Sequence, residues 1–437
     1  MQNYHKHSWF SNVLVTDCAT NPSAYIKRAW EVGHRVISTV EHGFQSNYYD
    51  IYDLVQDANQ MLLTQLENGE ITQEEYDKKK LKFIFGVEAY WVRDRQKEYP
   101  YEVTNSKGET EIKTHKDRTN CHIILLAKNE EGRRDINEAL SEANISGFYG
   151  QPRVDLELLM KIKPENVFVT TACLKYWVYE DIEEITLQLY NHFKDNFYLE
   201  IQCHNTERQK EINRKILEMH YKYGIGIICG LDSHYIYPED EIERNNYLEG
   251  RGIVYDEDER GWYMDYPDDD EVRRRLREQC VLTDAEIEEC MSTPDLLLDF
   301  DDITFDKDIK LPSSYPTESQ EWKDAKLREL VYSAWDKEKQ NVPEERWTEY
   351  EDGIEYELSA IMKTKMTDYF LLDHKIVEHG VAKGGIITKT GRGSGVSYYV
   401  NSLLGFSDID RFISPVVLYP DRFMSKTRIL LTRSLPD

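Results

Sequence analysis

The chain has 437 residues, of which 40% are hydrophobic, so it can bury a large core and form two or three domains. Its seven cysteines follow no regular spacing, and neither a signal-peptide pattern nor a membrane-length apolar run is present, so we expect a globular cytoplasmic protein with no membrane partner. A net charge of −27 argues against a generally basic nucleic-acid-binding protein, because neutralising phosphates requires lysine and arginine.

Short apolar, β-branched runs recur through the first half of the chain, and helical patterns separate most of them. The runs are Val36–Val40, Phe83–Val87, His122–Leu126, Val167–Thr171, Phe197–Ile201 and Ile225–Leu231, with His5–Ser8 as a seventh expected strand. The first helix is predicted to start at Asn21-Pro22, which supply an N-cap and an N1 proline, and to end at Gly33. This alternation predicts a parallel sheet, closed into a barrel of about seven units.

Potential metal ligands lie along the same half, several of them where an apolar run ends. The nine candidates are His5, His7, Asp17, His42, Glu88, His122, Cys173, Asp232 and His234. Any single histidine could be an ordinary buried polar residue, but the mixture of imidazole, carboxylate and thiolate suits first-row transition ions. Because the carboxyl ends of parallel strands share one mouth, we expect most of these side chains to converge there. His122 begins its run instead, and the pattern gives less support for its convergence.

A polar interruption and then a mainly helical region follow the early strands. The segment Asn105–Gly108 predicts a hairpin or a loop, to which we assign no chemistry. Beyond about Asp265 the pattern becomes helical, including Glu271–Cys280 and a capping box from Thr283 to Glu286. We therefore expect the first domain to cover residues 1–265 and a second to cover residues 266–437.

A glycine-rich turn in the second domain is typical of phosphate binding. Ile386-Ile387 predicts a strand, and Gly391–Gly395 leads from it into a predicted helix over Val396–Leu404. Glycines let backbone N–H groups approach a triphosphate, and Arg392 can offer paired donors. The alternative is an ordinary strand-to-helix loop. From Val381 onward basic residues outnumber acidic ones, so this segment is locally cationic despite the overall charge.

Two series of short motifs together resemble one family over nearly the whole chain. The first series is His5–Ser8, Ser38–Gly43, Phe85–Glu88, His122–Asn129, Thr171–Leu174 and Asp232–Tyr235. The second is Glu357-Leu358, Asp368–Leu371, Gly391–Ser394 and Leu404–Asp410. The first resembles the PHP (polymerase and histidinol phosphatase) domain of bacterial replicative DNA polymerase III alpha subunits, the family C polymerases, and the second resembles their palm.

The resemblance implies an α/β fold: a distorted (βα)7 PHP barrel followed by an incomplete polymerase-beta-like nucleotidyltransferase palm. All nine ligand positions of the barrel are filled and would hold up to three divalent metals, with zinc, manganese and iron all suited to the donors. The chain departs from the family at Glu41, where aspartate is usual, and at Asp17, which follows a longer spacer.

The implied function is template-directed DNA synthesis with a DNA primer-template, deoxynucleoside triphosphates and Mg in the palm. The residues Gly391, Arg392, Gly393 and Ser394 would bind nucleotide phosphate, and Asp437 matches the first catalytic aspartate of a Pro-Asp-x-Asp motif. The pair Asp408 and Asp410 belongs, by resemblance, to a structural segment. Because the second catalytic carboxylate would follow Asp437, we expect synthesis to require a C-terminal remainder, whether the chain is a fragment, half of a split gene or an interrupted precursor.

Three hypotheses remain for the first domain. It could be a metal-dependent 3′–5′ exonuclease, or a non-catalytic scaffold that metal stabilises and that docks a polymerase, a proofreading partner or other replisome subunits. The third, a small-molecule phosphatase on the same barrel, is disfavoured by the palm-like second half. Substitution of His42 separates the first two, because a scaffold would lose stability whereas an enzyme would lose cleavage and largely keep its fold.

Overall fold

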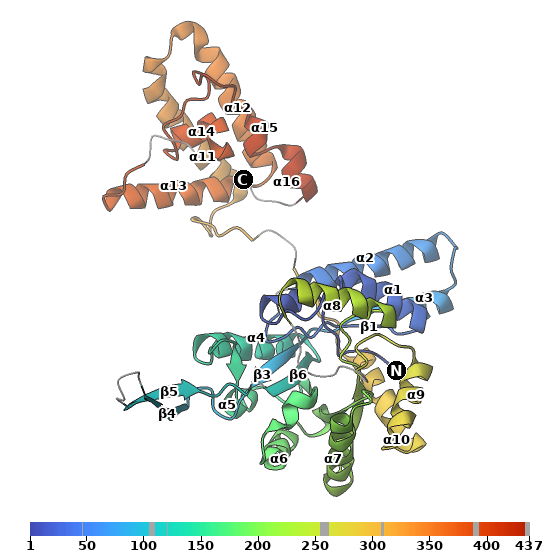
Figure 1. The fold of residues 1–437 in the computed structure, drawn as a ribbon. Helices are drawn as coiled ribbons and strands as arrows, with labels where there is room; N and C mark the ends of the chain where they lie inside the picture. Colours follow the sequence, from blue (N-terminus) through green and yellow to red (C-terminus); the bar gives the residue numbers. More distant parts are fainter. Residues whose placement is uncertain are drawn as a thin grey trace. The chain divides into compact units, whose positions relative to one another are not determined.

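The chain folds into two compact units, Met1–Phe305 and Asp306–Asp437, in a computed structural model (Figure 1). The structure describes residues 1–45, 47–104, 110–119, 121–253, 262–306, 310–387 and 393–432. Within these ranges no helix is both long and apolar enough to span a membrane.

The first unit is a mixed α/β structure built around a six-stranded sheet. In spatial order its strands are β10 (Gly226–Gly230), β9 (Phe197–Gln202), β8 (Val167–Thr170), β6 (Cys121–Ala127), β3 (Gly86–Trp91) and β7 (Arg153–Val154). Two further pairs are the parallel β1 (Val36–Ile37) with β2 (Lys82–Phe83) and the antiparallel β4 (Glu98–Thr104) with β5 (Thr110–Lys116). Most strands of the six-stranded sheet lie close to predicted runs, but β7 lies in no predicted run, and the His5–Ser8 segment forms an isolated bridge at Lys6 rather than the expected strand.

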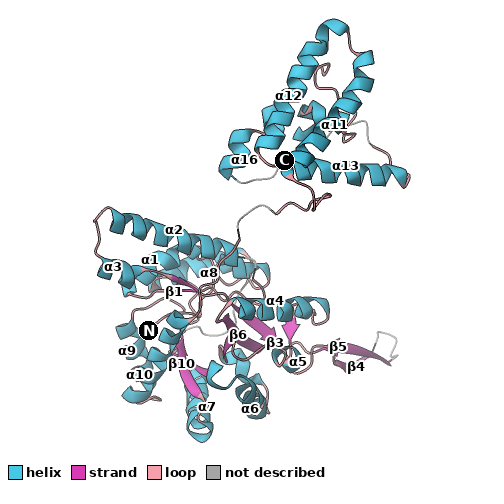
Figure 2. Ribbon diagram, turned by 180° about the vertical axis from the view of Figure 1, so that it is seen from behind, coloured by secondary structure: helices cyan, strands magenta, loops and turns pink. Residues whose placement is uncertain are grey.

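The direction of β6 differs from the prediction. It pairs antiparallel with both β3 and β8, while the other pairs in this sheet are parallel, so the prediction of a parallel sheet is wrong at this strand. The physical reason is the connection: β3 and β6 are joined through the β4 and β5 pair rather than through a crossover helix, which would have restored the parallel direction. The pair projects from the body of the unit (Figures 1 and 2).

Helices surround this sheet. They are α1 (Pro22–Val32), α2 (Tyr48–Glu67), α3 (Gln73–Lys79), α4 (Glu130–Ile145), α5 (Leu156–Leu159), α6 (Ile182–Phe193), α7 (Glu207–Tyr223), α8 (Glu241–Gly250), α9 (Asp269–Gln279) and α10 (Asp284–Ser292). Short 3-10 helices are η1 (Trp9–Val13), η2 (Leu174–Val178), η3 (Lys194–Asn196), η4 (Pro238–Asp240) and η5 (Thr293–Asp299). The predicted ends of α1 are confirmed: the Asn21 side chain accepts a hydrogen bond from Ser23 N–H, and Gly33 is left-handed with φ 78°.

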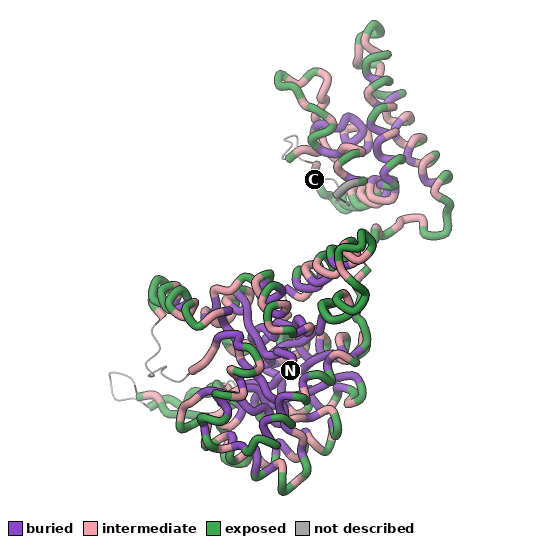
Figure 3. Tube along the Cα trace, turned by 90° about the vertical axis from the view of Figure 1, so that its right-hand side faces the viewer, coloured by how far each residue is buried: buried purple, intermediate pink, exposed green. Residues whose placement is uncertain are grey.

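The sheet is buried on both faces, which Figure 3 shows as a buried interior. Alternate residues of one strand belong to different apolar clusters: Ile123 and Leu125 of β6 pack with the surrounding helices, while Ile124 and Leu126 join an inner cluster. The inner cluster draws on widely separated segments, namely Tyr4, Val36, Val40, Ile84, Ile124, Leu126, Phe168, Ala172, Ile228, Leu297 and Phe300.

The first unit extends beyond residue 265, where the sequence placed the end of the first domain. Val272 and Leu276 of α9 and Ile287 of α10 are fully buried in the same core as the strands. The sequence placed these helices in the second domain because the strand pattern ends by about Asp265 and helical patterns follow it.

The described part of the second unit is helical (Figure 2). It contains α11 (Gln320–Glu338), α12 (Trp347–Lys363), α13 (Thr367–Ala382), α14 (Tyr399–Leu403), α15 (Pro420–Phe423) and α16 (Lys426–Thr432), with η6 (Lys339–Asn341), η7 (Glu344–Arg346) and η8 (Ser394–Ser397). The prediction of a strand at Ile386-Ile387 is wrong. Both residues lie outside any strand or helix, and Ile386 is 89% exposed. The described part of this unit also contains no strand that could pair with them.

Candidate metal centre

The predicted ligands converge at one edge of the sheet because backbone pairing brings their segments together. His7 N–H donates to the Ser233 carbonyl at 2.9 Å, which places the His5–His7 segment beside Asp232 and His234 after β10. His42 forms a parallel bridge with Glu88 in β3. The reversed direction of β6 explains His122: its first residues lie at the edge where the parallel strands end, and His122 sits opposite Tyr90 of β3.

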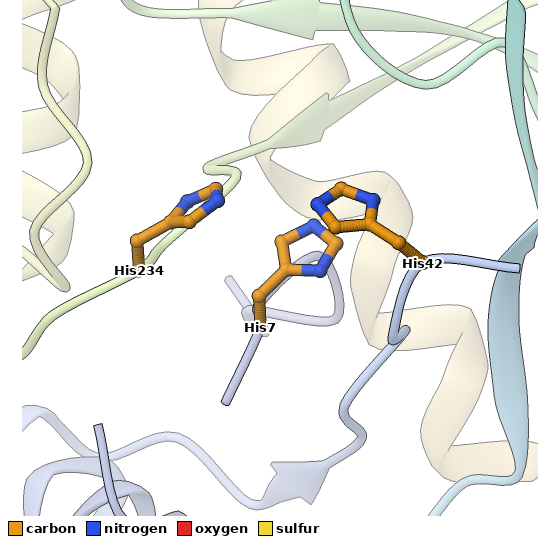
Figure 4. A group of neighbouring side chains, drawn as sticks. All are labelled: His7, His42 and His234. Carbon is orange, nitrogen blue, oxygen red and sulfur yellow. The ribbon is translucent and has the colours of Figure 1, made fainter. Parts of the chain in front are cut away.

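Seven of the nine candidates form three overlapping groups whose ligand atoms lie within 4.8 Å of one another. The groups are His7, His42 and His234; His5, His7 and Asp232; and His42, Glu88 and His122. Figure 4 shows the first group, in which rings from three separate segments lie side by side. The His7 and His42 ring centroids are 4.1 Å apart.

Two carboxylates, Glu88 and Asp232, lie between these imidazoles. Glu88 is the more central, because its oxygens lie 2.6 Å from His42 Nδ1, 2.9 Å from His122 Nδ1, 3.5 Å from His5 Nε2 and 3.7 Å from His7 Nε2. Asp232 Oδ1 lies 3.2 Å from Nε2 of both His5 and His7. A carboxylate shared among several imidazoles is the arrangement that bridges neighbouring cations.

The two remaining candidates lie at the margin of the three groups. Asp17 Oδ2 is 2.8 Å from His42 Nε2 and 3.4 Å from His234 Nε2. Cys173 Sγ is 3.3 Å from His122 Nδ1. Burial raises the pKa of the Cys173 thiol well above its usual range, so this sulfur becomes a strong ligand only when a cation displaces its proton.

Burial and charge act against each other in this cluster. Burial lowers the pKa of His122 to about 4, whereas for His42 the neighbouring Asp17 and Glu88 outweigh burial and raise the pKa to about 10. Burial would raise the pKa of Glu88, but His122 and His42 hold it well below its usual range. The site is therefore a set of buried, charged carboxylates that need cations, as protons or as metal ions.

Several buried atoms of the cluster form no hydrogen bond of good geometry with a described residue, although oppositely charged groups lie within 3.7 Å of some of them. They include Nε2 of His5, His7 and His122, Oδ1 of Asp17 and Asp232, and both oxygens of Glu88. Unpaired buried polar atoms are rare in folded proteins because each costs free energy, and here they share one small region. The donor set and its orphaned atoms fit divalent transition-metal ions.

A second layer of polar residues orients the imidazoles. His5 Nδ1 lies 2.7 Å from Glu200 Oε1, and Tyr4 OH and Gln202 Nε2 donate to the same carboxylate at 2.6 and 2.8 Å. Such partners fix the ring and leave Nε2 directed toward a cation. Sequence reasoning missed Glu200, although a carboxylate inside the apolar run of β9 was an available signal.

Glu41, where the chain departs from the family pattern, also acts indirectly. It accepts hydrogen bonds from Ser8 Oγ at 2.6 Å and Ser11 Oγ at 2.5 Å, and Ser11 Oγ lies 3.3 Å from His7 Nδ1. Glu41 thus supports the loop that carries His7. Backbone strain accompanies the site, since Asp232 and Ala172, which precedes Cys173, have positive φ values of 49° and 53°.

A cavity of about 350 Å³ lies over the cluster. Besides ligands it is lined by Val15, Tyr90, Leu174, Lys175, Arg244, Trp262 and Met264. Arg244 Nε donates to the Asp17 carbonyl at 2.8 Å, which anchors that ligand's backbone. His204, close to this cavity, is fully buried, and its Nδ1 accepts a hydrogen bond from Tyr263 N–H at 3.0 Å.

The candidate residues of the second unit are only partly described. Gly391, Arg392 and Asp437 lie outside the described residues. Gly393 has a positive φ of 80°, and the helix predicted after it forms as two pieces, η8 and α14. Asp410 accepts hydrogen bonds from Tyr350 OH and Phe412 N–H at 2.7 and 2.8 Å, as expected of a structural residue.

Comparison with known proteins agrees with both series of motifs. Residues 3–204 match the PHP domain, and residues 325–437 match the bacterial DNA polymerase III alpha NTPase domain. The DNA polymerase III subunit alpha of Aquifex aeolicus is 26% identical over 99% of this chain and 35% of its own length. That of Helicobacter pylori is 24% identical over 99% of this chain and 34% of its own length.

The chain therefore carries a PHP domain followed by polymerase III alpha NTPase sequence. It belongs to the bacterial DNA polymerase III alpha-subunit family. It spans about a third of the length of the curated relatives that it matches.

Proposed function

We propose that the first unit is a distorted (βα)7 PHP barrel. Hydrogen bonds that link seven extended segments in a ring support this proposal: Lys6 accepts from Val40 N–H, Glu88 pairs with Glu41 and Gly43, and the sheet continues from β3 to β10 and back to His5–His7. The inner apolar cluster also supports it, because a ring of strands encloses such a core. By this proposal the PHP domain covers residues 1–265, with α9 and α10 packed against it.

We propose that this barrel is a metal-dependent phosphoesterase that cleaves DNA from the 3′ end. The observation that carries the proposal is the overlap of three buried donor groups, with Glu88 shared among four imidazoles. Divalent cations at such a site neutralise a phosphodiester, generate hydroxide at neutral pH and stabilise the leaving oxygen. Zinc, manganese and iron all suit the donors.

The protein's own residues would have distinct roles in this reaction. His5, His7, Asp17, His42, Glu88, His122, Cys173, Asp232 and His234 would hold the cations. Glu200 and Ser11 orient His5 and His7, and Arg244 anchors the backbone of Asp17.

We infer that the whole chain is the N-terminal portion of a replicative polymerase, which the family membership supports. In that assembly Gly391, Arg392, Gly393 and Ser394 would bind nucleotide phosphate, and Asp437 would be the first catalytic aspartate, with Mg as its ion. The partners would be a DNA primer-template, deoxynucleoside triphosphates, the remaining C-terminal sequence and other replisome subunits in the bacterial cytoplasm. DNA synthesis then requires that remaining sequence.

The exonuclease proposal is tested with 5′-labelled single-stranded DNA and manganese or zinc. We expect products that shorten from the 3′ end with the parent chain and not with His42→Ala. His115→Ala is the matched control, because His115 is an exposed histidine of β5, and it should cleave like the parent. Intact DNA with every metal, together with a lower unfolding temperature of His42→Ala, would overturn the proposal and favour a metal-stabilised scaffold.

A further inference from the structure

Two chemically different sets of residues line the cavity above the metal cluster. One set consists of candidate ligands such as His42, His122 and Asp232, which suit a phosphate through bound cations. The other set is apolar and aromatic and includes Leu174, Met264 and Trp262, the largest side chain of the lining. A phosphate alone would not need the second set, so its presence points to a ligand with a flat apolar part next to the phosphate.

The position of Trp262 is fixed by contacts to the metal-binding segments. The Trp262 ring lies 4.8 Å from the His204 ring, and Tyr263 N–H donates to His204 Nδ1. Two residues later, the Met264 carbonyl accepts from His234 N–H at 2.7 Å and from Tyr235 N–H at 3.2 Å. Hydrogen bonds of Met264 therefore hold the segment that carries Trp262 against the segment that carries His234, one of the candidate ligands.

Lys175 supplies a cation at the same cavity. It follows Cys173 by two residues, is exposed, and has no carboxylate partner in the part of the chain that the structure describes. Asp17 and Asp232 also line this cavity, but neither forms an ion pair with Lys175, so this exposed lysine is suited to bind a backbone phosphate of the substrate.

We propose that this cavity is a subsite for one unpaired terminal nucleotide of a DNA strand. The base stacks on Trp262, the scissile phosphate faces the metal ligands, and Lys175 binds a neighbouring backbone phosphate. A volume of about 350 Å³ is large enough for a single nucleotide, and stacking on Trp262 requires that the base be unpaired and its face exposed. This inference rests on the proposed phosphoesterase function and names two further residues that would hold its DNA substrate, Trp262 at the base and Lys175 at the backbone.

The base contact is tested by equilibrium binding rather than by cleavage. Two fluorescein-labelled oligodeoxynucleotides are compared by anisotropy, one with an ordinary 3′-terminal nucleotide and one with an abasic 3′ terminus, both with a terminal phosphorothioate linkage that slows cleavage. Each oligonucleotide is titrated with the protein, once in the presence of zinc and once in the presence of EDTA. We expect the parent chain to bind the ordinary end about tenfold more tightly or better, as base stacking on an aromatic residue implies.

Variants of Trp262 should remove this preference. Trp262→Ala and Trp262→Leu should bind the two oligonucleotides equally, while Trp262→Phe should retain most of the preference. The Leu variant keeps an apolar side chain, so it remains informative if the Ala variant does not fold. Trp322→Ala, which removes a 40%-exposed tryptophan in the second unit, is the control and should behave like the parent. Equal binding of both ends by the parent, or a preference unchanged in Trp262→Leu, would overturn the proposal.

Lys175 is tested by the salt dependence of binding. Lys175→Gln should reduce the slope of log affinity against log salt by about one, as expected for one lost phosphate contact. Lys163→Gln is the matched control, because Lys163 is exposed and precedes β8, at the edge of the sheet opposite to the candidate ligands. The slope measured for this variant should equal that of the parent. Equal slopes for Lys175→Gln and the parent would remove Lys175 from the subsite.

The outcomes separate the subsite from the phosphoesterase function. A base preference that depends on Trp262, without cleavage under any metal, would support the subsite and overturn the phosphoesterase. Cleavage that proceeds equally on ordinary and abasic ends, with no effect of Trp262→Leu, would support the phosphoesterase and overturn the subsite.

Discussion

At the scale of single residues, Glu88 and Cys173 illustrate two kinds of candidate ligand. Glu88 lies within 3.7 Å of four imidazoles, whereas Cys173 contacts only His122 among the candidate ligands. We expect Glu88→Gln to lose more than one bound ion per chain and Cys173→Ser to lose at most one. Metal content after gel filtration, measured by mass spectrometry, tests this difference. Equal losses from the two variants would show that Glu88 does not bridge ions.

Glu200 gives a second prediction at this scale. It is fully buried and orients His5 without belonging to the ligand groups. Because such partners typically change metal affinity 10- to 100-fold, we expect Glu200→Gln to weaken zinc binding by about that factor. Competition with a chelator of known affinity measures it. Glu207→Gln, on an exposed side chain of α7, should bind zinc like the parent, and an unchanged affinity of Glu200→Gln would contradict the orienting role.

The residue types of the site were predictable from sequence, but their arrangement was not. His5, His42, Asp232 and their neighbours stand out because polar metal-binding side chains follow apolar runs. Ser11 has no such signal, because a side chain that orients a candidate ligand has no motif of its own, and Glu200 has only the signal of a carboxylate inside the apolar run of β9. Trp262 is likewise recognisable only when folding brings it next to His234, 28 residues away in the chain.

At the scale of elements, local signals predicted helix ends better than strand direction. The N-cap at Asn21 and the capping box at Thr283 act within a few residues, and both form as predicted. The direction of β6 depends on the connection between β3 and β6. A pattern of apolar residues shows where strands lie but not how they are connected. The strand predicted at Ile386-Ile387 failed for a related reason, because a strand requires a hydrogen-bonding partner.

The contribution of the β4 and β5 pair to stability and to the metal site can be tested. Its described residues are exposed or half-buried, and none belongs to an apolar cluster. Replacing residues 98–116 by an Asn-Gly turn should therefore change the free energy of unfolding by less than ~0.5 kcal/mol and leave the metal content unchanged. Denaturant unfolding and metal analysis check both. Loss of metal would show that the pair is needed to place His122.

Helix α9 gives a pH-dependent prediction. Arg274 and then Arg275 lower the pKa of Glu271 from 4.5 to about 2, against the effect of burial. A lowered carboxyl pKa contributes stability that is present above pH 4.5 and is lost as the pH falls through about 2. Glu271→Gln should thus be less stable than the parent above pH 4.5, and the difference should shrink as the pH falls toward 2.

Urea unfolding of the two proteins across this pH range measures the difference. Asp270→Asn is the control, because Asp270 precedes Glu271 in the same helix and its side chain is 97% exposed. This variant should follow the parent at every pH. A constant difference between Glu271→Gln and the parent would mean that the effect is not a titration of Glu271.

At the scale of the whole molecule, the two units have separate apolar cores. The core of the first contains α9 and α10, and the second has its own cluster around Trp335, Tyr350 and Phe370. We therefore expect residues 1–305 to unfold cooperatively and to bind the same number of metal ions as the whole chain. Residues 1–265 should not fold, because they lack Val272, Leu276 and Ile287, each fully buried in the first core.

Calorimetry with and without zinc would test both statements. Because a ligand stabilises only the folded unit that binds it, zinc should raise the unfolding temperature of residues 1–305 and of one transition of the whole chain, while a second transition stays in place. If residues 1–265 unfolded cooperatively and bound the full complement of zinc, α9 and α10 would be dispensable. The first domain would then end where the sequence pattern places it, and the burial of these helices would reflect packing onto a barrel that is already complete.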